Sequence, residues 1–146
     1  MVLVPNRELA EQVLEVFKLF KYEVPMKYFA LFSGQKYKIE RDKLKDGVDV
    51  LVTTPDRLQK HRERERLFFS SLLTVVVDEI DTLLDAGYGK EIKLLIEQVL
   101  GTKGGSKGEG PDSEPERLRN KQFVFVGATI TRGMETMVKE YFDGDK

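Results

Sequence analysis

The chain has 146 residues, a hydrophobic fraction of 40% and a formal net charge of −1. It contains no cysteine and one histidine, which excludes a disulfide scaffold, a thiolate metal site and a histidine metal cluster. No apolar run approaches the ~18 residues of a membrane span, and the near-neutral charge means that any nucleic-acid binding must come from local groups. The length predicts one domain, residues 1–146.

Five runs rich in apolar, β-branched or aromatic residues predict strands. They cover residues 2–4, 28–32, 48–52, 73–77 and 122–126. Each is apolar with little alternation, as in parallel strands that are covered on both faces. Because the chain opens inside the first run, without a basic leader, we expect upstream sequence in the complete protein and no signal peptide.

Helical spacing of apolar residues follows four of these runs. It predicts helices after an Asn6 cap and over residues 58–67, 92–99 and 134–141. The second helix is highly charged, and we expect His61 to be solvated on it. Strands that alternate with helices predict an α/β fold with a doubly wound parallel sheet. Residues 101–116 hold five glycines and two prolines, which predicts a disordered surface insertion.

Two adjacent carboxylates, Asp78 and Glu79, directly follow the fourth predicted strand. Ligands of α/β sheets gather at the carboxyl ends of the strands. An acid at that place can hold Mg²⁺ through water, and its neighbour can orient and deprotonate an attacking water. An ordinary acidic turn fits the same residues, so this segment alone leaves the alternatives open.

Three further segments place polar groups after a strand, where a phosphate could bind. The candidate residues are Pro5, Asn6, Arg7 and Glu8, then Ser33 and Gly34, then Thr54, Pro55 and Arg57. Helix capping or a simple turn explains each segment equally well by itself. A fourth segment, residues 127–129, follows the last strand and offers the Thr129 hydroxyl as a hydrogen-bonding group.

In their order and spacing, these segments resemble the first RecA-like domain of DEAD-box RNA helicases. The family pattern reads, in chain order, PTRELA, a glycine doublet, TPGR, DEAD and SAT. This chain has at the corresponding places VPNRELA, SGQ, TTPDRL, VVVDEID and GAT. The resemblance covers nearly the whole chain apart from residues 101–116. It implies an incomplete RecA-like sheet, a P-loop NTPase fold without its P-loop strand, and a gap or exposed edges where that strand is missing.

The resemblance also implies roles for the candidate residues. Asp78 would ligate Mg²⁺ through water, Glu79 would activate the hydrolytic water, and Asp81 would link the acidic motif to Thr129 and so couple hydrolysis to RNA unwinding. The three phosphate segments would contact or support the RNA backbone, independently of base sequence. ATP and Mg²⁺ are the implied cofactors of the complete protein, and we expect neither to bind this chain tightly.

Five positions depart from the family pattern. Asn6 replaces threonine, Gln35 and Asp56 replace glycines, Ile80 replaces alanine, and Gly127 replaces serine. Asn6 keeps a helix cap. The other four changes predict weakened or divergent coupling to RNA, because they alter backbone approach, charge and side-chain size.

Two functions stay open at this point. The chain lacks G-x-x-x-x-G-K-[ST] and the glutamine-bearing adenine motif, which the family places upstream, and the second RecA-like domain, which it places downstream. In the first, the chain is part of an ATP-dependent helicase that remodels RNA or RNA–protein complexes, and it is inactive by itself. The alternative is a non-catalytic relic that docks on RNA or protein.

The segment DEIDTLLDAGYG, the polar insertion and FVFVGAT together resemble organellar DEAD-box helicases that assist large ribosomal subunit assembly. That resemblance implies ribosomal or assembly-factor proteins as partners, no membrane partner, and an intracellular location. It leaves open whether the compartment is a mitochondrion, another organelle, the cytoplasm or the nucleus.

Overall fold

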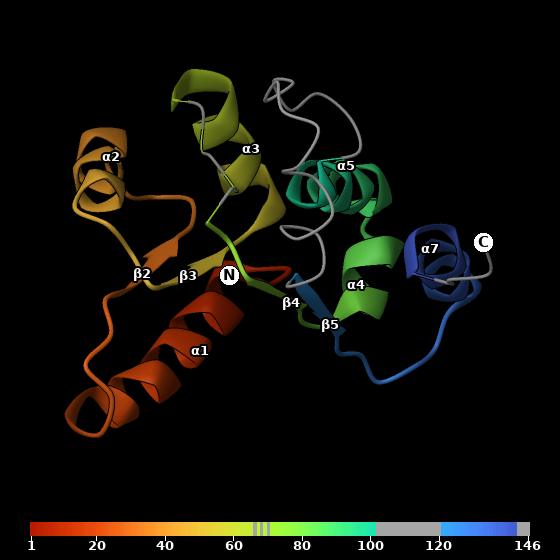
Figure 1. Ribbon diagram of the computed structural model, residues 1–146, viewed down its shortest axis with the longest axis horizontal. Helices are drawn as coiled ribbons and strands as arrows, with labels where there is room; N and C mark the ends of the chain where they lie inside the picture. Colours follow the sequence, from red (N-terminus) through yellow and green to blue (C-terminus); the bar gives the residue numbers. More distant parts are fainter. Residues whose placement is uncertain (66, 68, 70, 102–120, 143–146) are drawn as a thin grey trace, which may run out of the picture.

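The computed structural model describes residues 1–65, 67, 69, 71–101 and 121–142, which form one parallel sheet with helices around it (Figure 1). The strands are β1 (Val2–Leu3), β2 (Tyr28–Leu31), β3 (Val50–Thr53), β4 (Thr74–Val77) and β5 (Gln122–Phe125). They pair in the order β2-β3-β1-β4-β5, and every pair is parallel. The predicted α/β class and its five strands are therefore confirmed. The predicted insertion at 101–116 lies outside the described residues, except for Gly101.

The helices and the short 3-10 helix η1 lie between the strands in sequence. They are α1 (Arg7–Leu19), η1 (Phe20–Tyr22), α2 (Tyr37–Lys45), α3 (Pro55–Glu65), α4 (Ile80–Asp85), α5 (Gly89–Leu100) and α7 (Arg132–Phe142). The patterns in the sequence predict α1, α3, α5 and α7, but not α2 and α4. In the described part of the chain, no helix has the length and apolarity needed to cross a bilayer.

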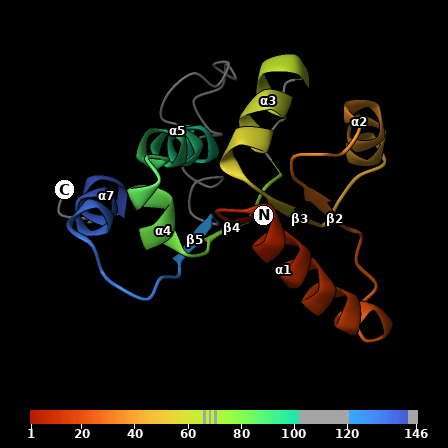
Figure 2. The ribbon, with the colours of Figure 1, turned by 180° about the vertical axis from the view of Figure 1, so that it is seen from behind.

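Alternation along the strands divides the apolar residues between two core clusters. Val2 packs with Ala10 of α1 on one face of the sheet, and its neighbour Leu3 packs with α3, α4, α5 and α7 on the other. Figures 1 and 2 show α1 on the opposite side of the strands from α3 and α5. Since both faces are covered around β1, this strand is fully buried despite its two-residue length.

The strand register brings the carboxyl ends of the strands to one edge of the sheet. Leu3 lies opposite both Thr53 and Val77, while Leu31 pairs with Thr53 and Val77 with Phe125. The backbone N–H of Val4 continues the ladder to the Thr53 carbonyl at 2.9 Å. Segments far apart in sequence therefore emerge side by side, where an α/β sheet binds its ligands.

The sheet is continuous, so the internal gap offered as one expectation is absent. Every strand from β2 to β5 has its neighbour within pairing distance. The other expectation, an exposed edge, fits β5, which pairs only with β4 among the described residues.

Candidate functional site

Asn6 and Arg7 open helix α1 at the carboxyl end of β1. The Asn6 side chain accepts a hydrogen bond from the Leu9 N–H at 2.8 Å, which confirms the predicted N-cap. The Arg7 guanidinium lies 4.9 Å from the centroid of the Phe32 ring and donates from Nε to Glu11 Oε1 at 2.8 Å. Half of the Arg7 side chain stays exposed, so a cation is held at this edge of the sheet with room for an anion.

The loop after β2 meets the start of α1 at Gly34. Gly34 has φ +99°, a backbone conformation that L side chains rarely adopt, and a Cβ at this position would lie 3.5 Å from Arg7 Nη1. Ser33 and Gly34 are both exposed. The structure therefore brings two of the three predicted phosphate segments into contact, and the positive φ favours glycine at this turn.

The third segment begins helix α3. Pro55 is the first helical residue, as predicted, and the Thr54 carbonyl accepts from the Leu58 N–H at 3.0 Å. The Thr54 N–H donates to the Leu31 carbonyl at 3.3 Å, which fixes this turn beside the end of β2. All three segments thus lie on the neighbouring strands β1, β2 and β3.

Arg57 does not present a free guanidinium to this surface. Its Nε donates to both carboxylate oxygens of Glu40 at 3.0 Å, and Nη2 donates to the Gln35 carbonyl at 3.0 Å. The Arg57 side chain is 15% exposed and Glu40 is fully buried. The geometry therefore supports a positioning role, in which Arg57 holds the 33–35 loop against α3, in place of the direct phosphate contact that we expected from the sequence.

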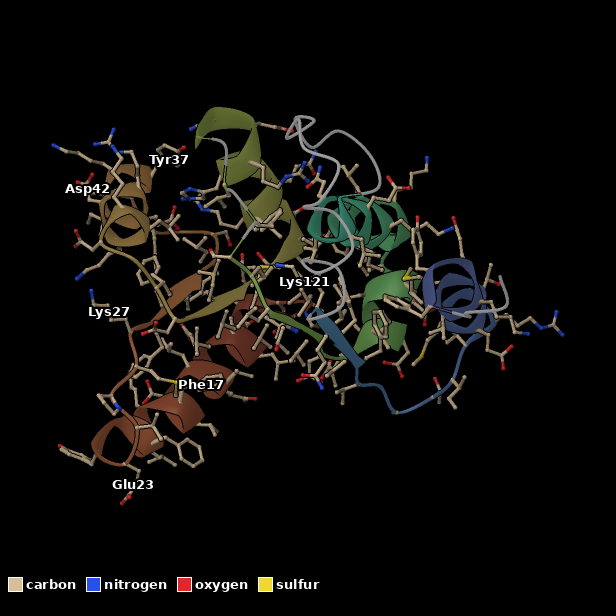
Figure 3. All side chains as sticks on the ribbon, viewed as in Figure 1. Phe17, Glu23, Lys27, Tyr37, Asp42 and Lys121 are labelled. Carbon is tan, nitrogen blue, oxygen red and sulfur yellow. The ribbon has the colours of Figure 1, made fainter. Side chains whose placement is uncertain are left out.

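The expectation that His61 is solvated is wrong. His61 is fully buried: its Nε2 lies 2.8 Å from Glu40 Oε2, and its ring stacks on Tyr37 with centroids 4.6 Å apart. Tyr37 is labelled on α2 in Figure 3. Sequence analysis also missed Glu40, although Tyr37, Glu40 and Leu44 share one helical face by their spacing of three and four residues.

Asp78 and Glu79 lie at the turn from β4 into α4. The Asp78 N–H donates to the Leu3 carbonyl at 2.9 Å, and the Glu79 N–H donates to Asp78 Oδ1 at 2.9 Å. Glu79 has a φ of +48°. Among the described residues, every other positive φ belongs to a glycine. This left-handed conformation costs free energy in a residue other than glycine, and such residues cluster at active sites.

The acidic turn fits a magnesium ion that is bound mainly by water and phosphate. Within the described ranges, no group of three carboxylate, histidine or cysteine ligands comes together. Mg²⁺ usually keeps several waters and takes one or two protein carboxylates beside substrate phosphates. Asp78, half-buried at the end of the strand with Glu79 exposed beside it, provides that kind of incomplete ligand set.

Asp81 joins α4 to the segment after β5, as the resemblance implies. Its Oδ2 accepts from the N–H groups of Ala128 at 3.1 Å and Thr129 at 3.0 Å, and from the Thr129 hydroxyl at 3.2 Å. The Thr82 N–H donates to Oδ1 at 3.1 Å. These donors, the Thr129 N–H foremost, lower the pKa of Asp81, because they stabilise the carboxylate form.

Asp56, where the family has glycine, turns toward α5. Its Oδ2 accepts a hydrogen bond of 3.0 Å from the Tyr88 hydroxyl. This bond raises the pKa of Tyr88, because the phenolate form would lose it and face the Asp56 charge. The contact ties the start of α3 to the start of α5.

Comparison with known proteins identifies the family of this chain. The model of the DEAD/DEAH box helicase family matches residues 1–137. DEAD-box ATP-dependent RNA helicase 7 of Arabidopsis thaliana is 38% identical over 99 residues, which are 68% of this chain and 15% of that protein. ATP-dependent RNA helicase DDX50 of Mus musculus is 32% identical over 141 residues, 97% of this chain and 17% of that protein.

A solved structure shares the fold. The yeast DEAD-box splicing factor Prp28 matches with a TM-score of 0.75 and 26% sequence identity, over 96% of this chain and 30% of the Prp28 chain. The described sheet and its surrounding helices are thus similar to a RecA-like helicase domain. In length, the chain spans 15% and 17% of the two curated relatives above.

Proposed function

Since the chain belongs to the DEAD/DEAH box helicase family, we propose that it supplies part of the ATP- and RNA-contacting surface of an ATP-dependent RNA helicase. The observation that carries the proposal is the shared edge of the sheet. Asp78 and Glu79 end β4, and Arg7, Gly34 and Thr54 lie after the neighbouring strands on the same edge. One ligand surface can therefore meet a nucleotide at one end and an RNA backbone at the other.

In this proposal the residues after β4 act on the nucleotide. Asp78 would hold Mg²⁺ through water, and the metal would supply positive charge next to the transferred phosphate. Glu79 would orient the attacking water and take its proton, with its carboxylate aimed by the left-handed backbone. Asp81 would carry a shift of this turn to Ala128 and Thr129 through three hydrogen bonds, and so toward α7.

RNA would lie along the residues after β1, β2 and β3. Arg7 supplies a half-exposed cation, the N-terminus of α1 supplies N–H groups, and Gly34 allows the backbone to come close. Pro5, Glu8 and Pro55 would support this surface by shaping the two helix starts. Contacts of this kind go to phosphate and ribose, so the affinity should not depend on base sequence.

A titration of single-stranded RNA by fluorescence anisotropy tests the placement of RNA. We expect Arg7→Ala to weaken binding equally for different base sequences, and to reduce the slope of log affinity against log salt by about 0.7, one phosphate contact. Arg64→Ala is the matched control. Arg64 also lies over an aromatic ring, at 5.1 Å from the Tyr37 centroid, but on the far part of α3. A larger loss from Arg64→Ala than from Arg7→Ala would overturn the placement.

We expect the purified 146-residue chain not to hydrolyse ATP. Its sequence has no G-x-x-x-x-G-K-[ST] segment, so the β- and γ-phosphates have no cradle beside the acidic turn. Phosphate release should be measured with and without single-stranded RNA, for the chain and for Glu79→Gln. RNA-stimulated release that Glu79→Gln abolishes would show that the expectation is wrong.

A second candidate is the non-catalytic docking module. The hydrogen bonds of Arg57 favour the docking module, because its guanidinium binds Glu40 and the Gln35 carbonyl inside the protein. One cation of the expected RNA surface is therefore not available to RNA. Normal complementation by Glu79→Gln in the complete protein would support this candidate, and loss of function would support the helicase.

Ribosome assembly and an organellar location are further proposals. They rest on the segment DEIDTLLDAGYG, the glycine-rich stretch and FVFVGAT. Fractionation of cells that express the tagged complete protein, followed by sedimentation of ribosomal subunits, tests both. Co-sedimentation with immature large subunits is the expected result, and its absence from every organelle would contradict the location.

A further inference from the structure

A small groove lies between α3 and α5, away from the acidic turn. The α3–α5 groove has a volume of about 100 Å³ and is lined by Leu3, Leu58, Leu94, Leu95, Arg62 and Lys90, among others. Leu3, Leu58 and Leu95 are buried in the core, whereas Leu94 is 43% exposed at the rim. The floor is therefore apolar, and part of the wall is open to solvent.

Two cations stand at this groove without an ion pair in the described part of the chain. Arg62 is half-buried on α3, and Lys90 is exposed in the first turn of α5. Burial lowers the pKa of Arg62, which means that its charge lacks full compensation within the protein. Positive charge that is only partly compensated beside an apolar pocket attracts an acidic ligand.

One acceptor in the same wall also lacks a partner. The Oε2 atom of Glu91 is buried and accepts no hydrogen bond from any described residue. A buried acceptor without a donor costs free energy, which a donor from a bound partner would recover. A peptide backbone brings N–H donors, which an RNA phosphate lacks, so a peptide is the better match to this acceptor.

The size of the groove sets the kind of occupant. Pockets for cofactors and drug-sized ligands measure about 300–1,000 Å³, several times this volume. A volume of about 100 Å³ instead fits one aliphatic side chain, the type of anchor that carries much of the affinity at protein interfaces. We propose that the α3–α5 groove docks an acidic protein segment, with one leucine-like anchor on the apolar floor and acidic neighbours against Arg62 and Lys90.

The position of the groove connects such a partner to the turn after β3, which belongs to the proposed RNA surface. The Asp56–Tyr88 hydrogen bond joins α3 and α5 next to it, and Pro55 belongs both to its wall and to the turn after β3. A segment bound here would hold α3 against α5. It would leave Arg7, Gly34 and the acidic turn uncovered, because none of them lines the groove.

Selection from a library of random twelve-residue peptides against the 146-residue chain tests the proposal. We expect the selected peptides to share one aliphatic residue with acidic neighbours. Replacing that aliphatic residue with alanine should weaken binding about tenfold or more, the loss of one buried side chain. Selected peptides without an acidic bias, or without an aliphatic position that matters, would overturn the proposal.

Charge reversal then places the peptides on the molecule. Lys90→Glu should weaken peptide binding about tenfold, because a like charge would face the acidic neighbours, and lysine in their place should recover it. Glutamate in the first turn of α5 does not threaten the fold, since it suits the positive end of the helix dipole. Lys43→Glu on α2 makes the same charge change away from the groove and should have no effect.

Two results would count against the proposal in this second experiment. Equal losses from Lys90→Glu and Lys43→Glu would show a general effect of charge. A loss of single-stranded RNA binding in Lys90→Glu, with peptide binding unchanged, would assign the groove to the RNA surface. Thermal unfolding of both variants excludes a loss of structure as the cause.

Discussion

Ile80 and Gly127 stand where the family pattern has alanine and serine, and the two positions share one space in the fold. A Cβ at Gly127 would lie 3.1 Å from Ile80 Cγ2 and 3.1 Å from Asp81 Oδ1, closer than most such contacts. Ile80 is fully buried in the core. The two departures therefore compensate for each other: the larger side chain at 80 fills room that a side chain at 127 would need.

This compensation predicts non-additive effects on stability. Gly127→Ser should destabilise the protein by about 1–2 kcal/mol through overpacking, and Ile80→Ala by about 2–4 kcal/mol through the cavity it leaves. The double variant should cost less than the sum, by about 1 kcal/mol, because each change relieves the other. Urea unfolding of the three variants measures the coupling.

Gly133→Ser provides the control for the serine itself. A Cβ at Gly133 would lie 3.5 Å from Leu84 Cδ1, an ordinary contact, so this change should be tolerated whether or not Ile80 is replaced. Strict additivity of Ile80→Ala and Gly127→Ser would show that the two positions relax independently.

Helices α2 and α3 show why part of the site could not be predicted from the sequence. The strands, α1, α5 and α7 follow from apolar spacing, because their buried faces are apolar. The buried face of α2 instead carries Glu40, while Ile39 is 55% exposed. Hydrophobic periodicity would bury Ile39 and expose Glu40. Burial of Glu40 depends on its ion pair with Arg57, a contact between distant segments that periodicity does not detect.

The same pair predicts a large effect from one substitution. Arg57→Ala should destabilise the protein by about 3 kcal/mol or more, because it leaves the fully buried Glu40 carboxylate without its main counter-charge. Adding Glu40→Gln should recover part of that loss, since no buried charge then remains. Urea unfolding of the single and double variants measures both values. If Arg57→Ala were as mild as a surface substitution, the ion pair would not hold α2 against α3.

For the molecule as a whole, the sequence predicted a parallel sheet and the residues at its carboxyl edge, but not the strand order. Each strand is recognised from its own residues, whereas the order depends on contacts between segments far apart in sequence. The uninterrupted order leaves β5 at one edge. The Gln122 N–H donates to the Leu73 carbonyl at 2.8 Å, and the Val126 N–H donates to the Val77 carbonyl at 2.9 Å. The alternate residues Phe123 and Phe125 therefore direct their backbone groups outward.

This edge predicts self-association of the chain. Among the described residues, no strand pairs with the outer side of β5. An apolar edge strand of this kind pairs readily with another chain, and Val126 and Ile130 beside it are 45% and 77% exposed. We expect sedimentation velocity to show association that rises with concentration.

Val124→Lys should suppress this association, because lysine adds charge at the edge of the sheet. The change costs the core little, since Val124 is half-buried and lies on the sheet face opposite Phe123. Val16→Lys on α1, where Val16 is 53% exposed, adds the same charge elsewhere and should leave association unchanged. Equal suppression by both variants would assign the effect to net charge, and a monomer at every concentration would show that the expectation is wrong.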